Sequence, residues 1–146
     1  MANIKTLERI QELREFKKDE IAQEVKKAAA VVKSEYKRLE TMEVDLKENL
    51  SALDRNINSK TGNINEITLI YDYIEFMYRK IDAQKVIIID REKELAAKEL
   101  ELLEAFKDVK VIETLKDKMI NEEKKRQSAI EQKTMDYLYL SRMPKA

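Results

Sequence analysis

The sequence predicts an all-α fold, an antiparallel two-helix coiled-coil hairpin whose C-terminal helix is longer than its N-terminal helix. Three observations predict it. The 146 residues include one Gly and one Pro, the residues that most readily turn or stop a helix. Charged residues make up 40% of the chain, which restricts an apolar core to a narrow stripe. Apolar residues recur at alternating steps of three and four, as they do in coiled coils.

The first helix is expected over about residues 3–59. Upstream of Ala22, four apolar residues recur every third position and stay near one helical face: Leu7, Ile10, Leu13 and Phe16. From Ala22 onward the steps alternate between three and four, and Glu43 is the one polar position. This predicted seam consists of Ala22, Val25, Ala29, Val32, Tyr36, Leu39, Glu43, Leu46, Leu50, Leu53 and Ile57.

A turn is expected at about residues 60–63. Gly62 is suited to the left-handed conformation that often follows the end of a helix. Asn63, followed three residues later by Glu66, is typical of the start of a helix. The second helix is therefore expected over about residues 64–142.

The seam of the second helix is marked by apolar residues at a spacing of seven. They are Ile67, Ile74, Ile81, Ile88, Leu95, Leu102 and Val109, with Ile70, Met77, Ala105, Ile112 and Met119 at intermediate positions. Gln84, Arg91 and Lys98 occupy the other intermediate positions. Two interpretations are open. Their stems cover the edge of the seam while their polar heads reach solvent, or they pair with first-helix acids such as Glu35 or Glu43 and fix the register.

The second helix is expected to overhang the first. A reversal around Gly62 places residue i opposite roughly residue 124 minus i, so the first helix is exhausted near residue 120. Residues from about 121 to 142 then project roughly 30 to 35 Å. They include Ile130, Met135, Tyr137, Leu138, Tyr139 and Leu140. This apolar density favours a partner-binding segment over a frayed, solvated end. We expect residues 1–146 to form a single coiled-coil domain.

Four aromatic residues lie within eight positions near the turn: Tyr71, Tyr73, Phe76 and Tyr78. Residues one and two apart point to different sides of a helix, so some of these rings must lie outside the seam. Two interpretations are again open, because such rings either anchor a partner or fold over the end of the hairpin.

The composition argues against most kinds of chemistry. The chain has no Cys and no His, which removes thiol and imidazole nucleophiles, bases and metal ligands. It has no Gly-rich phosphate-binding loop, and two paired helices make no concave pocket. We expect no enzymatic activity, no cofactor and no metal. The acidic pairs Glu122–Glu123 and Asp90–Glu94 are expected to be solvated or paired with Lys.

The net charge and the hydropathy of the chain indicate where the protein acts and which kinds of partner it binds. The net charge is zero, which disfavours nucleic acid as a partner. The longest strongly apolar run is Val86–Ile89, far short of the ~20 residues that span a bilayer. We therefore expect a cytoplasmic protein that does not insert into the membrane and that is a monomer in isolation.

Four segments carry recognisable local patterns. They are the opening Leu7–Arg14, the segments Tyr73–Gln84 and Glu113–Lys118, and Glu131–Asp136 followed by Arg142. The opening resembles the start of the FliJ family of the flagellar type III export apparatus, the last segment resembles its C-terminal signature, and the two middle segments also fit this family. One departure is Tyr137, which stands where family members commonly have an acid.

The resemblance implies a non-enzymatic, stalk-like protein of flagellum biogenesis and motility. Such a protein is cytoplasmic and peripherally associated with the inner membrane through the export apparatus. It promotes export by binding the export ATPase FliI and the export-gate membrane protein FlhA, and export chaperones are further candidate partners. The residues implied for the ATPase ring are Glu131, Gln132, Lys133, Met135 and Asp136, and those for the gate are Arg38, Met42, Tyr73, Met77 and Lys80.

Two alternative functions use the same fold. One is a structural or tethering coiled coil in which the C-terminal segments of two copies pair and cover their apolar residues. The other is the equivalent stalk of a virulence type III secretion system.

Overall fold

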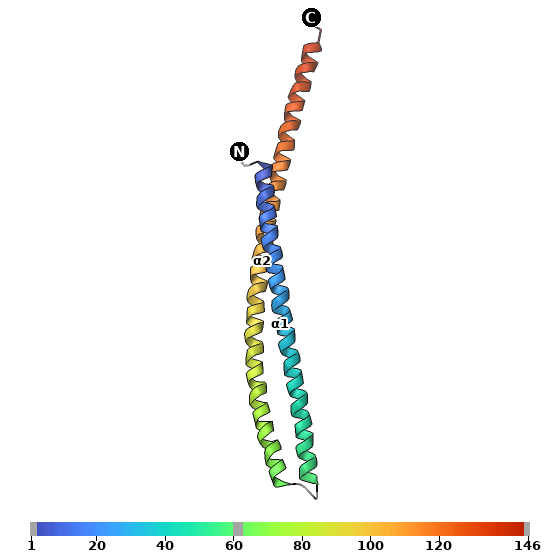
Figure 1. The fold of residues 1–146 in the computed structure, drawn as a ribbon. Helices are drawn as coiled ribbons and strands as arrows, with labels where there is room; N and C mark the ends of the chain where they lie inside the picture. Colours follow the sequence, from blue (N-terminus) through green and yellow to red (C-terminus); the bar gives the residue numbers. More distant parts are fainter. Residues whose placement is uncertain (1–2, 60–62, 145–146) are drawn as a thin grey trace. The chain divides into compact units, whose positions relative to one another are not determined.

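The fold consists of two long helices (Figure 1). The computed structural model describes residues 3–59 and 63–144. Helix α1 runs over Ile4–Asn58 and helix α2 over Ile64–Arg142. With 79 residues against 55, α2 is the longer helix. The described residues include no strand, and the predicted all-α hairpin with a longer second helix is confirmed.

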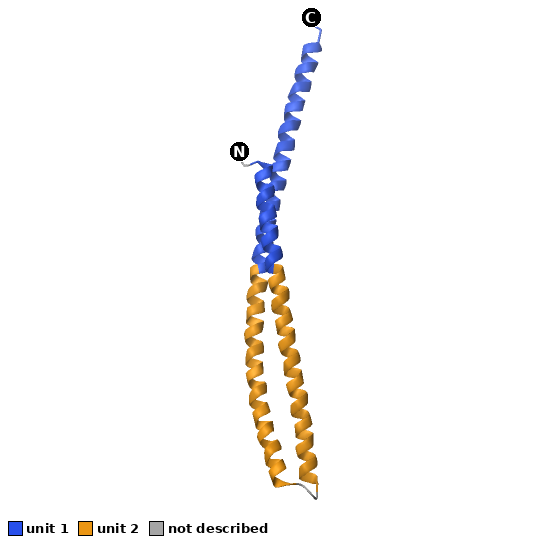
Figure 2. Ribbon diagram, viewed as in Figure 1, with its two compact units in different colours: residues 1–21, 102–146 blue, residues 22–101 orange. Residues whose placement is uncertain are grey.

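The chain divides into two compact units (Figure 2). Unit 1 combines residues 1–21 with residues 102–146, and unit 2 consists of residues 22–101. In each unit a segment of α1 packs antiparallel against a segment of α2. The expectation of a single domain over residues 1–146 stays a prediction.

Asparagine side chains cap the start of both helices. The Asn3 carboxamide oxygen accepts a hydrogen bond from the Thr6 amide at 2.9 Å. The Asn63 carboxamide oxygen accepts one from the Asn65 amide at 3.0 Å, and the Asn63 carbonyl accepts the Ile67 amide at 3.0 Å. These bonds satisfy amides that have no partner within the helix. The predicted cap at Asn63 is confirmed, while the turn residue Gly62 lies outside the described residues.

The seam predicted for α2 is confirmed. The apolar side chains at the seven-residue spacing and between them are buried or half-buried. The buried apolar members are Ile74, Met77, Ile81 and Ile88 in unit 2, and Ala105, Val109 and Ile112 in unit 1. The half-buried members are Ile67, Ile70, Leu95, Leu102 and Met119.

The seam predicted for α1 is only half correct. The positions Val25, Val32, Leu39, Leu46 and Leu53 are half-buried as expected. At the positions between them the structure turns inward the residue just before the predicted one: Ala28, Glu35, Met42, Asn49 and Asn56 in place of Ala29, Tyr36, Glu43, Leu50 and Ile57. Tyr36, Leu50 and Ile57 are instead 47%, 40% and 59% exposed. The prediction was wrong at these positions because residues three and four apart share a helical face. It favoured the apolar Tyr36, Leu50 and Ile57 over their polar neighbours, and it carried the same spacing through Ala29 and Glu43.

Two asparagines on the inner side of α1 donate hydrogen bonds from their side-chain amides to backbone carbonyls of the same helix. The Asn49 side-chain amide donates to the Asp45 carbonyl at 2.8 Å, and the Asn56 side-chain amide donates to the Ala52 carbonyl at 3.0 Å. These bonds to the preceding turn let asparagines border a seam without a partner on α2.

The four residues Leu7, Ile10, Leu13 and Phe16 do not all lie on one face. Leu7 is buried and Ile10 is half-buried, but Leu13 and Phe16 are 70% and 65% exposed. Each step of three residues turns the side chain back by about 60°, so repeated steps leave the seam. The seam continues from Leu7 at steps of four, three and four through the half-buried Gln11, Arg14 and Lys18, and Glu15 is also half-buried.

In unit 1, long charged side chains of α1 contact α2 at seam positions that have no apolar residue. The Arg14 guanidinium donates to the Asp108 carbonyl at 2.9 Å, and the Lys18 ammonium lies 5.2 Å from the centre of the Phe106 ring. Their stems cover apolar surface while their charges find partners on α2.

Ion pairs between the helices report the register. Glu8 contacts Lys116 at 3.7 Å in unit 1, and Glu24 contacts Lys98 at 3.0 Å in unit 2. The expected pairing of residue i with roughly residue 124 minus i places Glu8 opposite residue 116 and Glu24 opposite residue 100. Both ion pairs agree with the expected register.

The phase of α2 is testable with two adjacent residues. Ile88 is 4% exposed, whereas its neighbour Ile89 is 51% exposed. We expect Ile88→Ala to lower the free energy of unfolding by about 2 to 4 kcal/mol through lost burial and a cavity, and Ile89→Ala to lower it by less than about 1 kcal/mol. Urea denaturation followed by circular dichroism measures both, and equal losses would contradict the assigned phase.

Candidate interaction surfaces

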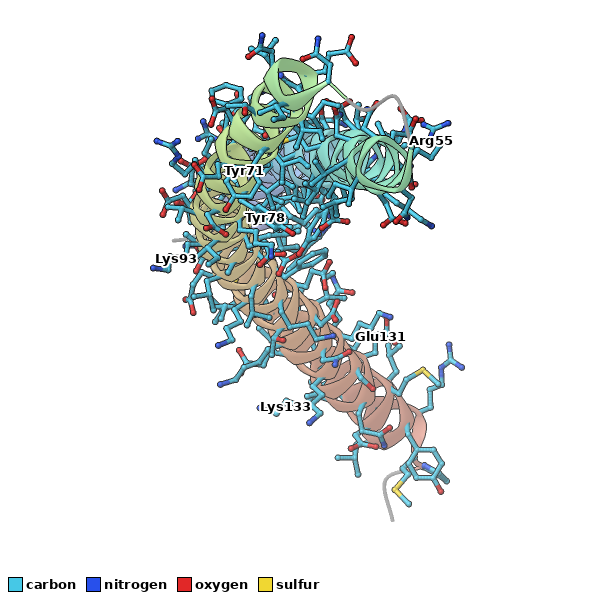
Figure 3. All side chains as sticks on the ribbon, turned by 90° about the horizontal axis from the view of Figure 1, so that it is seen from below. Arg55, Tyr71, Tyr78, Lys93, Glu131 and Lys133 are labelled. Atoms are coloured by element: carbon cyan, nitrogen blue, oxygen red, sulfur yellow. The ribbon has the colours of Figure 1, made fainter. Side chains whose placement is uncertain are left out.

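The C-terminal part of α2 has no partner helix among the residues that the structure describes. Glu123 is the last half-buried residue, and every described residue from Lys124 to Pro144 is exposed. The helix nevertheless continues to Arg142, about 27 Å beyond Lys124 at 1.5 Å per residue. We call residues 124–142 the overhang. Figure 3 shows Glu131 and Lys133 projecting from opposite sides of this helix.

The overhang contains four consecutive apolar residues near its end. Tyr137, Leu138, Tyr139 and Leu140 are 72%, 44%, 67% and 64% exposed. Successive helical residues differ in direction by about 100°, so these four side chains extend around about 300° of the helix. We call residues 137–140 the apolar tip. A helix that is apolar on all sides is normally surrounded by other protein or by lipid.

The five residues implied for the ATPase ring lie together just before the apolar tip. All are exposed: Glu131, Gln132, Lys133, Met135 and Asp136. The Gln132 side-chain amide donates to the Asp136 carboxylate at 3.3 Å, one turn away. The set of residues implied for the ATPase ring ends at Asp136 and does not include the apolar tip. The run of apolar residues at 137–140 is the sequence signal that indicates it.

Unit 2 brings together most of the residues implied for the gate protein. Arg38 and Met42 of α1 and Lys80 of α2 line one open groove of about 650 Å³. Met42, Met77 and Lys80 also line an adjoining groove of about 340 Å³. Because the two grooves share Met42 and Lys80, both helices contribute to one continuous surface, which the expected register allows. We call the residues Arg38, Met42, Met77 and Lys80 the strip.

Met77 is buried, and Tyr73 is only partly accessible to a partner. Met77 is 2% exposed and packs in the seam, so it supports the strip from beneath. The Tyr73 hydroxyl donates to the Asp45 carboxylate at 2.7 Å, which leaves the ring, 40% exposed, as its accessible part.

The aromatic residues near the turn are all partly exposed. Tyr71, Phe76 and Tyr78 are 55%, 52% and 50% exposed, and Figure 3 labels Tyr71 and Tyr78 on this part of α2. The Tyr73 and Phe76 ring centres are 6.2 Å apart, and the Lys80 ammonium lies 6.0 Å from the centre of the Phe76 ring. The prediction that some rings lie outside the seam is confirmed.

The three polar seam residues of α2 behave differently from one another. Gln84 is 3% exposed, and its amide donates to the Glu35 carbonyl at 3.0 Å and to the Glu35 carboxylate at 2.5 Å. Lys98 also pairs across the seam, with Glu24 at 3.0 Å. Arg91 pairs within its own helix, with Glu94 at 3.0 Å. Pairing with α1 therefore holds for Gln84 and Lys98, whereas Arg91 keeps its head at the surface.

Two tyrosines join the helices of unit 2 through carboxylates. The Tyr36 hydroxyl donates to Glu92, and the Tyr73 hydroxyl donates to Asp45. These hydrogen bonds raise the pKa of both tyrosines, because the protonated phenol is the donor. The Lys98 pKa is also raised, first by its hydrogen bond to Glu24 and then by that to Glu101.

The described residues include no group of three or more acidic side chains arranged to hold a metal ion. Within residues 3–59 and 63–144, neither helix contains a stretch long and apolar enough to cross a membrane.

Comparison with protein families places nearly the whole chain in one of them. The family model described as flagellar FliJ protein matches residues 3–143. No curated protein and no solved structure matches the chain.

The tyrosine–carboxylate bonds predict a pH dependence. A group whose pKa is raised by folding stabilises the fold below its unfolded pKa and loses that contribution as the pH rises through its folded pKa. We expect the melting temperature to fall above about pH 10, and to fall less steeply in the double variant Tyr36→Phe, Tyr73→Phe, which retains both rings. Thermal melts from about pH 8 to about pH 12 measure this, and equal slopes in the two proteins would refute the assignment.

Proposed function

The chain belongs to the FliJ family, a non-enzymatic component of the flagellar type III export apparatus, and from this premise we propose that it links the export ATPase FliI to the export-gate protein FlhA. In this proposal the chain promotes export as a stalk-like coiled coil. It acts in the cytoplasm, at the inner face of the membrane that holds the gate, and export chaperones are further partners.

The apolar tip carries the proposal for the ATPase. An apolar stripe on one face would suit a single partner helix, but residues 137–140 are apolar around most of the helix. A ring that encloses the helix covers such a tip from every side. The charged segment before it, which includes Glu131, Lys133 and Asp136, suits the wetter rim of the same contact.

The strip in unit 2 supports the proposal for the gate protein. Arg38, Met42 and Lys80 line one groove. The exposed ring of Phe76 lies beside Lys80, and the exposed ring of Tyr73 lies next to that of Phe76. Partly exposed aromatic and Arg side chains are the residues that most often anchor protein partners. The apolar tip belongs to unit 1 and the strip to unit 2, so separate parts of the chain carry the two contacts.

The apolar tip also favours a second candidate function, because the overhangs of two copies can cover each other in a tethering dimer. Sedimentation over a range of concentrations separates the two. A monomer supports the stalk, and a dimer that is lost on deletion of residues 122–146 supports the tether. The flagellar family match favours flagellar export over a virulence secretion system.

The stalk proposal is tested by substitution of the apolar tip. We expect a fourfold Ser variant of Tyr137, Leu138, Tyr139 and Leu140 to lose stimulation of purified FliI by at least about tenfold, since several buried apolar side chains would be removed from the contact. Truncation after Asn121 is expected to abolish co-assembly with FliI.

The control replaces exposed apolar residues outside the overhang. Leu13 and Phe16 lie in the same unit and are as exposed as the apolar tip. We expect the variant Leu13→Ser, Phe16→Ser to stimulate FliI as the unmodified chain does. Full stimulation by the tip variant or by the truncated chain would overturn the assignment.

A further inference from the structure

The larger groove of unit 2 has a one-sided charge. We call it the cationic groove. Its lining contains three cations and no acid: Lys37, Arg38, Thr41, Met42, Lys80, Ala83, Gln84 and Ile87. In a chain with equal numbers of acidic and basic residues, such a local excess is a feature of the fold and not of the composition.

These cations are largely free to pair with a partner. Neither Lys37 nor Lys80 forms an ion pair with any acid in residues 3–59 and 63–144. Arg38 forms an ion pair with Glu35 at 3.9 Å, and the Glu35 carboxylate also accepts one hydrogen bond from Gln84. Lys37 and Lys80 have no such pair among the described residues, so the groove keeps a net positive charge.

The same lining contains apolar side chains. Met42 is half-buried, Ile87 is 39% exposed, and Ala83 completes the apolar part of the lining. A segment that fits the groove therefore presents carboxylates at its edges and an aliphatic or aromatic side chain toward its centre.

The adjoining groove limits how far such an acidic segment can extend. It shares Thr41, Met42 and Lys80 with the cationic groove, but its lining adds Asp45 and Glu48. Like charges across an interface are costly, so the acidic residues of the ligand belong opposite Lys37 and Arg38 and not beyond Lys80.

We propose that the cationic groove binds an acidic segment with a central apolar side chain, contributed by the export-gate protein. The identity of the partner rests on the proposed function, whereas the chemistry of the ligand rests on the groove alone. Because the contact is electrostatic at its edges, its affinity falls as salt is added.

Two binding measurements on the full chain test the proposal. The first probe is a synthetic heptapeptide of alternating Glu and Leu, compared with one of alternating Lys and Leu. We expect the acidic peptide to shift the NMR signals of Thr41, Ala83 and Ile87 and to bind at least about fivefold more tightly than the basic one. The second probe is the purified cytoplasmic part of FlhA, measured at low and at high salt.

Charge reversal supplies the variants. We expect the double variant Lys37→Glu, Arg38→Glu to bind the acidic peptide and FlhA about tenfold more weakly, since each attraction between opposite charges becomes a repulsion. The control Lys93→Glu reverses an exposed lysine of the same unit that lies outside the groove, and is expected to change either affinity by less than about twofold.

The outcomes separate the two proposals. No binding of the acidic peptide, equal binding of the basic peptide, or an unchanged affinity in the Lys37→Glu, Arg38→Glu variant overturns the acidic-ligand proposal, even where FlhA binds. Selective binding of the acidic peptide at the groove without binding of FlhA supports the ligand chemistry and counts against the gate as its source.

Discussion

A two-helix hairpin can bury only one stripe of each helix, and this constraint governs the rest of the molecule. The stripe of α2 is built from residues such as Ile74, Ile81 and Ile88, and no segment within residues 3–59 and 63–144 covers the other faces. Beyond Glu123 the partner helix is missing, so every side chain of the overhang is exposed. Apolar residues outside the stripe therefore contribute nothing to burial within the chain, and their presence at the apolar tip calls for a partner.

A second consequence is that polar residues share the stripe. Gln84 is buried and gives its amide to Glu35, a bond that an aliphatic residue cannot replace. Such a contact favours one alignment of the two helices, because a shift by one position would leave a buried amide without an acceptor. It also holds Glu35 in the seam, which leaves Arg38 and its neighbours to define the cationic groove.

The sequence predicts α2 better than α1 for a physical reason. In α2 apolar residues repeat every seven positions without a competing set nearby, so one face stands out. In α1 the inward residue between two seam positions and the residue that follows it are equally suitable by spacing, and hydrophobicity favoured Tyr36 and Leu50 over Glu35 and Asn49. The inward position depends on contacts with the other helix, such as that between Gln84 and Glu35, and periodicity within one helix does not contain them.

The same distinction applies to the surfaces. The position and exposure of Glu131–Asp136 follow from helix lengths and register, which the sequence predicts. The burial of Met77 and the hydroxyl bond of Tyr73 depend on side-chain neighbours across the seam. So does the lack of ion pairs between Lys37 or Lys80 and any described acid. These contacts depend on the positions of both helices, which the pattern within one helix does not contain. They determine which residues of the implied gate surface are accessible to a partner.

Hydrogen exchange of the overhang, free and bound to FliI, tests the central claim most directly. In the free chain no burial offsets the cost of ordering these residues, so their amides should exchange much faster than those around Val109. On binding FliI, the amides around the apolar tip should become protected. Strong protection in the free monomer, or unchanged exchange at residues 137–140 in the complex, would contradict the account.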